Sequence, residues 1–199
     1  MTRKETTRLL TDILITDRMA DRKYYAREVT LDYGTTHSKR IDVVQFSPKG
    51  VVFASDIEKG TFTCYEIKSC KEDLYSGHGL NFYGEKNYIV TTMQTYKDIQ
   101  GDIRDGSLKK YIREHYPESS LNFGFIVPVP SGLDLRKNNE VYAEYQNPTP
   151  FSGDIYWKMH TIIPCTEGRR MRSTTELLFC MLRSKHSWTN IVDESEEQA

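Results

Sequence analysis

The chain has 199 residues, a length typical of a single domain with its own hydrophobic core. Its hydrophobic content of 38%, charged content of 28% and formal net charge of −1 are ordinary, so nucleic-acid binding would need a local basic patch. No run approaches the roughly 20 apolar residues of a membrane span, and the N-terminal segment is too polar for a signal peptide. Four cysteines without C-x-x-C spacing favour free thiols in a reducing compartment. We therefore expect a cytoplasmic protein with no membrane association.

The predicted elements form a mixed α/β pattern. Thr2-Arg-Lys-Glu5 matches a capping box and is followed by apolar residues at helical spacing, which predicts an amphipathic helix over 3–20. Strand-favouring stretches are expected at 24–32, 40–46, 50–55, 61–68, 86–92, 122–129, 141–145 and 156–163. Further helices are expected to open at 70–75 and 173–176 and to span 107–115. The acidic residues 193–199 have nothing to pack, so a single domain over 1–192 and a disordered tail are expected.

Three charged residues fall in two of these strands. Glu66 and Lys68 stand at i and i+2 and therefore share a face, while Asp42 lies in an apolar strand one hairpin upstream. If the two strands pair, all three groups converge, and burying them without partners would be costly. A divalent cation between Asp42 and Glu66 would relieve the repulsion. The alternative is an exposed strand with a Glu and a Lys in water, since an E-x-K triplet arises by chance about once in a chain of this size.

With a helix, Asp42, then Glu66-Ile-Lys68 and a following strand, the chain resembles the PD-(D/E)XK nuclease superfamily. Within it, the chain is most similar to the MmcB-like family, which is associated with DNA repair. The stretches that carry the likeness are Arg40-Ile-Asp42, Tyr65 through Leu74, Lys86 through Val90 and Arg172 through Phe179. Ile41 stands where the superfamily name has a proline, and no clear Gln or Lys follows on the next helix.

The resemblance implies a restriction-endonuclease-like core, with a central mixed β-sheet flanked by helices. It also implies a Mg²⁺-dependent deoxyribonuclease, also served by Mn²⁺, that hydrolyses phosphodiester bonds in DNA during repair or in a mobile-element setting. Asp42 and Glu66 would ligate the metal, and the backbone carbonyl of Ile67 would complete the site. Lys68 would orient the attacking water or help to deprotonate it. Superfamily members that cut both strands are often dimers, which leaves a homodimer open.

Two acidic residues and one histidine are further candidates for the site. Many superfamily members add an acidic ligand from the first helix, and Glu5 would fill this role, although a capping box explains Glu5 equally well. Glu28, on the strand before Asp42, is its rival. His78 lies near the motif, but a role there would require its loop to fold over the site.

The basic residues suggest where DNA could bind. Arg169, Arg170 and Arg172 precede the C-terminal helix and could meet phosphates beside its N-terminus, or form a solvated loop. Lys39 and Arg40 lie immediately before Asp42 and could supply a second contact. The alternatives to a nuclease are a catalytically inactive nuclease-fold protein that binds nucleic acid or a protein partner, and an interaction module.

Overall fold

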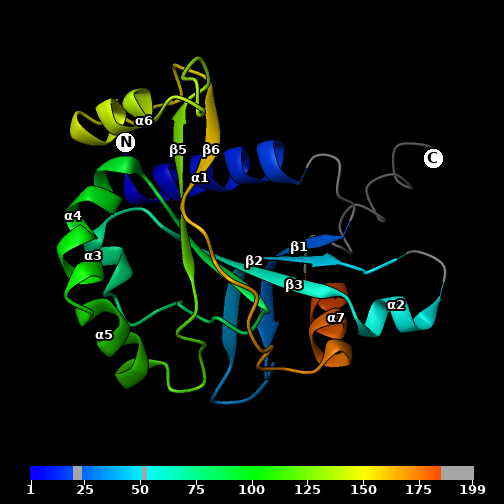
Figure 1. Cartoon of the computed structure of the whole chain (residues 1–199). Helices are drawn as coiled ribbons and strands as arrows, with labels where there is room; N and C mark the ends of the chain where they lie inside the picture. The colour runs from blue at the N-terminus through cyan, green and yellow to red at the C-terminus, as the bar shows by residue number, and fades with distance from the viewer. Residues whose placement is uncertain (20–23, 51–52, 185–199) are drawn as a thin grey trace, which may run out of the picture.

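The computed structural model describes residues 1–19, 24–50 and 53–184. As expected from the sequence, this part of the chain forms an α/β fold with a mixed sheet flanked by helices (Figure 1). The sheet has six strands. The strands are β1 (Tyr25–Leu31), β2 (Lys39–Ser47), β3 (Thr61–Lys68), β4 (Lys86–Thr91), β5 (Gly124–Pro130) and β6 (Trp157–Ile163). The helices are α1 (Arg3–Arg18), α2 (Ala54–Glu58), α3 (Lys71–Leu74), α4 (Met93–Arg104), α5 (Ser107–His115), α6 (Asn138–Gln146) and α7 (Thr174–Arg183).

The strands lie in the sheet in the order in which they occur in the chain. β1, β2 and β3 form an antiparallel meander, β3, β4 and β5 are parallel, and β6 is antiparallel to β5. Parallel neighbours need a crossover connection. α3 therefore lies between β3 and β4 in the chain, and α4 with α5 lies between β4 and β5.

Side-chain alternation along β3 divides the sheet into two packed faces. Tyr65 and Ile67 pack with Leu10 and Leu14 of α1 on one face. On the opposite face, α3, α4 and α5 cover the parallel strands, and α7 covers the antiparallel strands β1 and β2 (Figure 1). Glu66 and Lys68 alternate with Tyr65 and Ile67 and therefore belong to this second face.

A local irregularity bends the first strand. Glu28 has a φ of 51°, in the left-handed region that residues with a Cβ rarely adopt. Strict alternation from Ala26 would bury residues 28 and 30, yet Val29 and Leu31 join the cluster that contains Ala26. The inward-facing positions of β1 therefore change at Glu28.

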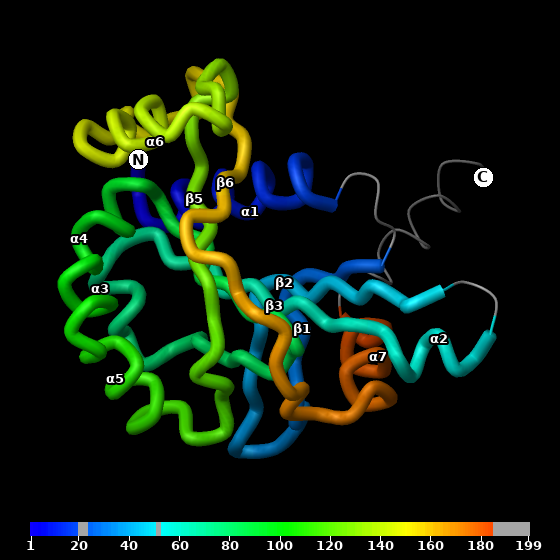
Figure 2. Tube along the Cα trace, in the orientation of Figure 1, coloured from blue at the N-terminus to red at the C-terminus, as the bar shows by residue number. Residues whose placement is uncertain are grey.

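The pairing of β2 with β3 ends beside this bend. β2 remains paired with β1 as far as Lys39, but its last pair with β3 is Val43 with Tyr65. Figure 2 shows the tip of the β1–β2 hairpin turning away from the direction in which β3 continues. Asp42 and Glu66 are the first residues beyond this last pair, so they lie where the two strands part.

Two expected strands are wrong. Residues 141–145 lie in α6, where Tyr142 and Tyr145 are three positions apart, with ring centroids separated by 6.4 Å, and Tyr145 contacts Tyr96 of α4. Helical packing against α4 overrides the strand preference of these tyrosines. In the expected strand 50–55, residues 51–52 lie outside the described part, and Ala54 and Ser55 belong to α2. The Asp56 carboxylate caps this helix by accepting a hydrogen bond from the Phe53 N–H.

Helix α4 was not expected from the sequence, although Thr92 caps it by accepting a hydrogen bond from the Thr95 N–H. The acidic tail 193–199 and the boundary expected at residue 192 lie outside the described residues. None of the described helices combines the length and apolar character that crossing a bilayer demands.

Candidate functional site

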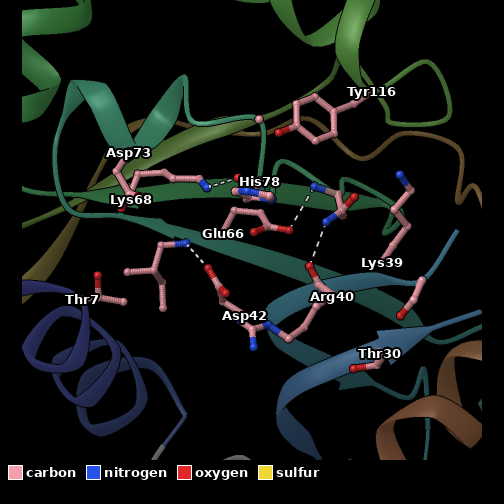
Figure 3. Close-up of a pocket in the computed structure, with 15 residues that line it drawn as sticks. Thr7, Thr30, Lys39, Arg40, Asp42, Glu66, Lys68, Asp73, His78 and Tyr116 are labelled. Carbon is pink, nitrogen blue, oxygen red and sulfur yellow. Dashed lines mark hydrogen bonds between the residues drawn. The ribbon is translucent and has the colours of Figure 1, made fainter. Parts of the chain in front are cut away.

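A cavity of about 550 Å³ opens where β2 and β3 separate (Figure 3). Asp42, Glu66 and Lys68 all line it, so the fold brings together the three charged residues of the sequence motif. His78 and Tyr116 lie across the cavity from Asp42 (Figure 3).

Glu66 and Lys68 are almost completely withdrawn from solvent, with 0% and 4% of their surfaces exposed. Glu66 Oε1 accepts a hydrogen bond of 3.0 Å from the Asn81 N–H, whereas Glu66 Oε2 is buried and makes no hydrogen bond. Lys68 Nζ donates to the His78 carbonyl oxygen at 2.6 Å. The loop that contains His78 therefore does fold over the motif, and it contributes a backbone carbonyl there.

Asp42 is held against the end of β3. Its Oδ2 accepts a hydrogen bond of 2.8 Å from the Ile67 N–H, which lies beyond the last β2–β3 pair. The carboxylate thus satisfies a backbone donor where the strands separate. Ile67 itself also lines the cavity.

Burial and charge act against the ionised form of Glu66. Burial raises the pKa of Glu66 well above its usual range, the nearby Asp42 raises it further, and Lys68 only partly offsets both effects. Burial also raises the pKa of Asp42, against the lowering effects of the Ile67 N–H and Lys68. A bound cation would favour the charged form of both groups.

Asp73 is a third acidic residue at the cavity, to which sequence analysis assigned no role. Its Oδ2 accepts hydrogen bonds from the Ser69 N–H at 3.0 Å and the Ser69 hydroxyl at 2.9 Å, and its Oδ1 pairs with Arg3 at 2.8 Å. Burial acts to raise the pKa of Asp73, but these contacts with Ser69 outweigh it and lower the pKa. Asp73 therefore ties the start of α1 to α3.

The donor set is compatible with a Mg²⁺ or Mn²⁺ ion. Within the described ranges, no group of three or more His, Cys, Asp and Glu side chains is placed to hold a metal. Mg²⁺, however, is commonly held by only one or two carboxylates, with waters and substrate phosphates as its other ligands. Asp42 and Glu66 supply two carboxylates in one cavity, and the unpartnered Glu66 Oε2 is a hard oxygen donor.

Glu5 is not brought to this cavity. Its Oε2 accepts a hydrogen bond of 2.7 Å from the Thr2 N–H, and its own N–H is capped by the Thr2 side chain. The capping box expected at Glu5 is therefore formed. Glu28 is exposed and lies in a groove beside the cavity.

Arg170, which was expected to contact DNA, is engaged in an ion pair away from the cavity. Arg170 pairs with Glu85 at 2.9 Å and lies over the ring of Phe62, 5.3 Å from its centroid. Neither Arg170 nor the exposed Arg169 lines the cavity.

Arg172 is similarly committed. It pairs with Asp32 at 3.0 Å and with Glu118 at 3.1 Å, and its guanidinium lies 5.2 Å from the ring centroid of Tyr83. Since these partners come from three separate parts of the chain, Arg172 has a structural role that sequence spacing did not reveal.

Lys39 and Arg40, by contrast, line the cavity. They lie where the sequence predicts a second basic contact with DNA. Arg40 also borders an adjoining groove of about 480 Å³, which shares Thr7 and Asp42 with the cavity. The other basic residues of this groove are Lys4, Arg8 and Arg27. Sequence analysis missed them, although Lys4 and Arg8 are four positions apart and thus share a helix face.

The fold and the cavity together define a mixed α/β protein with a polar, charge-lined site at the point where two central strands separate. In comparisons with known proteins, no family model matches the chain, and no curated protein or solved structure shows significant similarity to it.

Proposed function

We propose that this protein is a metal-dependent nuclease of PD-(D/E)XK type, with a restriction-endonuclease-like core, that hydrolyses phosphodiester bonds in DNA in the cytoplasm. The observation that carries the proposal is the buried and unpartnered Oε2 of Glu66, in the cavity that also contains Asp42 and Lys68. An ionised carboxylate in this position needs a positive partner, and a hard divalent cation suits its oxygens.

The residues have distinct tasks in such a reaction. Asp42 and Glu66 hold the cation, which supplies Lewis-acid polarisation of the scissile phosphate when bound. Lys68 orients the attacking water and balances the negative charge that develops beside it. Its ammonium group donates one hydrogen bond to the His78 carbonyl, and its two other N–H groups can donate to the attacking water.

The surroundings support a polyanionic substrate. Lys39 and Arg40 border the cavity, and the adjoining groove along α1 adds Lys4 and Arg8, with Asp12 and Glu28 as acidic neighbours in the same groove. Phosphate contacts of this kind position a nucleic acid without reading its sequence.

A second candidate function is binding of nucleic acid without cleavage. The observation that favours it is the near-complete burial of Glu66 and Lys68 under the loop around His78. In that case Lys39 and Arg40 would matter for affinity, while Asp42 could be replaced with little effect.

The test is a cleavage assay on single-stranded, duplex and branched DNA, with Mg²⁺, Mn²⁺ or EDTA. The proposal predicts metal-dependent cutting by the wild type and its loss in Asp42→Ala and Lys68→Ala. Asp98→Ala, which removes an exposed carboxylate from α4, is the matched control and should cut normally. Unchanged cutting by Asp42→Ala would contradict the proposal, and DNA binding without any cutting would favour the second candidate.

A further inference from the structure

Unpartnered buried polar atoms concentrate at one place in the molecule. Among the described residues, five buried side-chain nitrogen or oxygen atoms make no hydrogen bond, and three belong to residues that line the candidate site. These three atoms are Glu66 Oε2, Asn81 Oδ1 and the Tyr116 hydroxyl oxygen. Because a buried acceptor without a partner is costly, such a concentration indicates a ligand that supplies the missing interactions.

The orientation of the Asn81 amide is determined by its neighbours. Asn81 Nδ2 donates to the Arg40 carbonyl oxygen at 2.8 Å, so flipping the amide would place two acceptors against each other. The opposite atom, Oδ1, is therefore the one left without a partner, and only 3% of the residue is exposed. The Asn81 N–H donates to Glu66 Oε1, which keeps this residue next to the carboxylate.

The backbone that presents Asn81 is unusual. Gly79 and Leu80 both have positive φ values, 76° and 70°, and Leu80 is nevertheless fully buried in the core. A non-glycine residue in this region is strained and is retained where the surrounding structure demands it. Here the conformation turns the chain back so that Asn81 meets both Glu66 and the Arg40 carbonyl.

We propose that Asn81 is a further ligand of the divalent cation, which it binds through Oδ1 together with Asp42 and Glu66. This inference rests on the proposed function and extends its ligand set to the loop after α3. Amide oxygens, like carboxylates, are hard ligands suited to Mg²⁺ and Mn²⁺. A water molecule could satisfy the same acceptors, but it carries no charge and would leave Asp42 and Glu66 repelling each other.

The test is calorimetric titration of Mn²⁺ into the full-length wild type, Asn81→Ala and Asn81→Asp. Asn81→Ala should weaken Mn²⁺ binding by about 10-fold or more, in the range seen for losing groups that support a metal site. Asn81→Asp should bind Mn²⁺ at least as tightly as the wild type, because it keeps an oxygen ligand and adds a negative charge. Asp98→Ala, which removes an exposed carboxylate from α4, is the control and should leave Mn²⁺ affinity unchanged.

The aspartate variant separates a ligand from a merely structural residue. If Asn81 served only to donate from Nδ2 to the Arg40 carbonyl, Asn81→Asp would lose that donor and weaken Mn²⁺ binding as much as Asn81→Ala, which overturns the inference. Equal losses in Asp98→Ala and Asn81→Ala would overturn it too, because the Mn²⁺ measured would then not be bound at the cavity. Should Asn81→Ala fail to fold, the aspartate variant decides alone, since retained Mn²⁺ binding supports the inference and lost binding overturns it.

Failure of this inference can be told apart from failure of the proposed function. A wild type that binds Mn²⁺ and cuts DNA, with unchanged Mn²⁺ affinity in both Asn81 variants, overturns the role of Asn81 alone. A wild type that binds no Mn²⁺ overturns both.

Discussion

Glu66 has the least favourable environment of the charged residues at the site when no cation is bound. It is completely buried, faces Asp42 across the separating strands, and has one oxygen without a hydrogen bond. Proteins accept such a group when function requires it, at the expense of stability. We therefore expect Glu66 to lower the free energy of unfolding of the metal-free protein.

We predict that Glu66→Gln stabilises the metal-free protein at neutral pH. The folded-state pKa of Glu66 is raised above the ordinary value of 4.5, mainly by burial, so the folded protein binds this proton more tightly than the unfolded chain. The stabilising contribution is complete below pH 4.5 and is lost as the pH rises through the folded-state pKa. An uncharged glutamine cannot lose a proton, so Glu66→Gln avoids this pH-dependent loss of stability. Each kcal/mol gained in the free energy of unfolding raises Tm by about 2–4 °C.

Thermal unfolding in EDTA between pH 5 and 8 measures this effect. The wild type should lose Tm as the pH rises, and Glu66→Gln should lose less over the same range. Glu114→Gln, which changes an exposed carboxyl group on α5, should behave like the wild type. Identical pH slopes for the wild type and Glu66→Gln would show that Glu66 is not responsible.

At the scale of elements, the loop after α3 depends on two glycines that can be compared directly. Gly77 and Gly79 have nearly the same positive φ, 80° and 76°. A Cβ at Gly77 would meet nothing within 4 Å, whereas a Cβ at Gly79 would lie 2.6 Å from Lys68 Nζ and 2.8 Å from Glu66 Oε2. The two positions therefore separate backbone strain from interference with the site.

We predict that Gly77→Ala and Gly79→Ala each lower the free energy of unfolding by roughly 1–2 kcal/mol, because both force alanine into the left-handed region. Only Gly79→Ala should also impair Mn²⁺ binding and cleavage, since its methyl group displaces Lys68 and Glu66. Urea unfolding and Mn²⁺ titration measure the two effects. Similar Mn²⁺ affinities in both variants would mean that the loop does not control the site.

The bend in β1 gives a second prediction at this scale. Glu28 adopts a φ of 51°, and glycine would tolerate this conformation better than glutamate. Glu28→Gly should therefore raise the free energy of unfolding by up to about 1 kcal/mol. Thr30→Gly, two residues further along the same strand, is the control and should lower it. Loss of Mn²⁺ affinity in Glu28→Gly would instead restore Glu28 as a metal ligand.

For the molecule as a whole, the basic residues fall into two groups with different tasks. Arg40 borders the cavity and the groove along α1, whereas Arg172 joins β1, α5 and α7 regions through ion pairs with Asp32, Glu118 and Glu176. A near-neutral chain that binds DNA must do so through such a local arrangement.

We predict that Arg40→Ala weakens DNA binding and lowers the slope of log affinity against log salt by about 0.9, the value for one lost phosphate contact on duplex DNA. Arg172→Ala should lower Tm while leaving that salt slope unchanged. Fluorescence anisotropy at several salt concentrations and thermal unfolding provide the two measurements. A reduced slope in Arg172→Ala alone would reverse the assignment of the two groups.

The sequence by itself determined the α/β class, most of the elements and the positions of Asp42, Glu66 and Lys68. Alternation along β3 and the capping signals of α1 and α7 are local, so they could be recognised without tertiary contacts. The strand expected at 141–145 failed because the tyrosines there are stabilised by packing against α4. Local propensity carries no information about such a partner.

Only the tertiary structure decided which residues share the cavity. Asn81 lies in the loop after α3, Tyr116 directly follows α5, and Asp73 belongs to α3. No spacing in the chain links these three residues to Asp42. The same holds for the ion pairs of Arg172 with Asp32 and Glu118, which lie 140 and 54 positions away in the chain. The physical reason is that burial and charge pairing depend on the distance in space between groups, and residues far apart in the chain become neighbours only when the sheet and its helices pack.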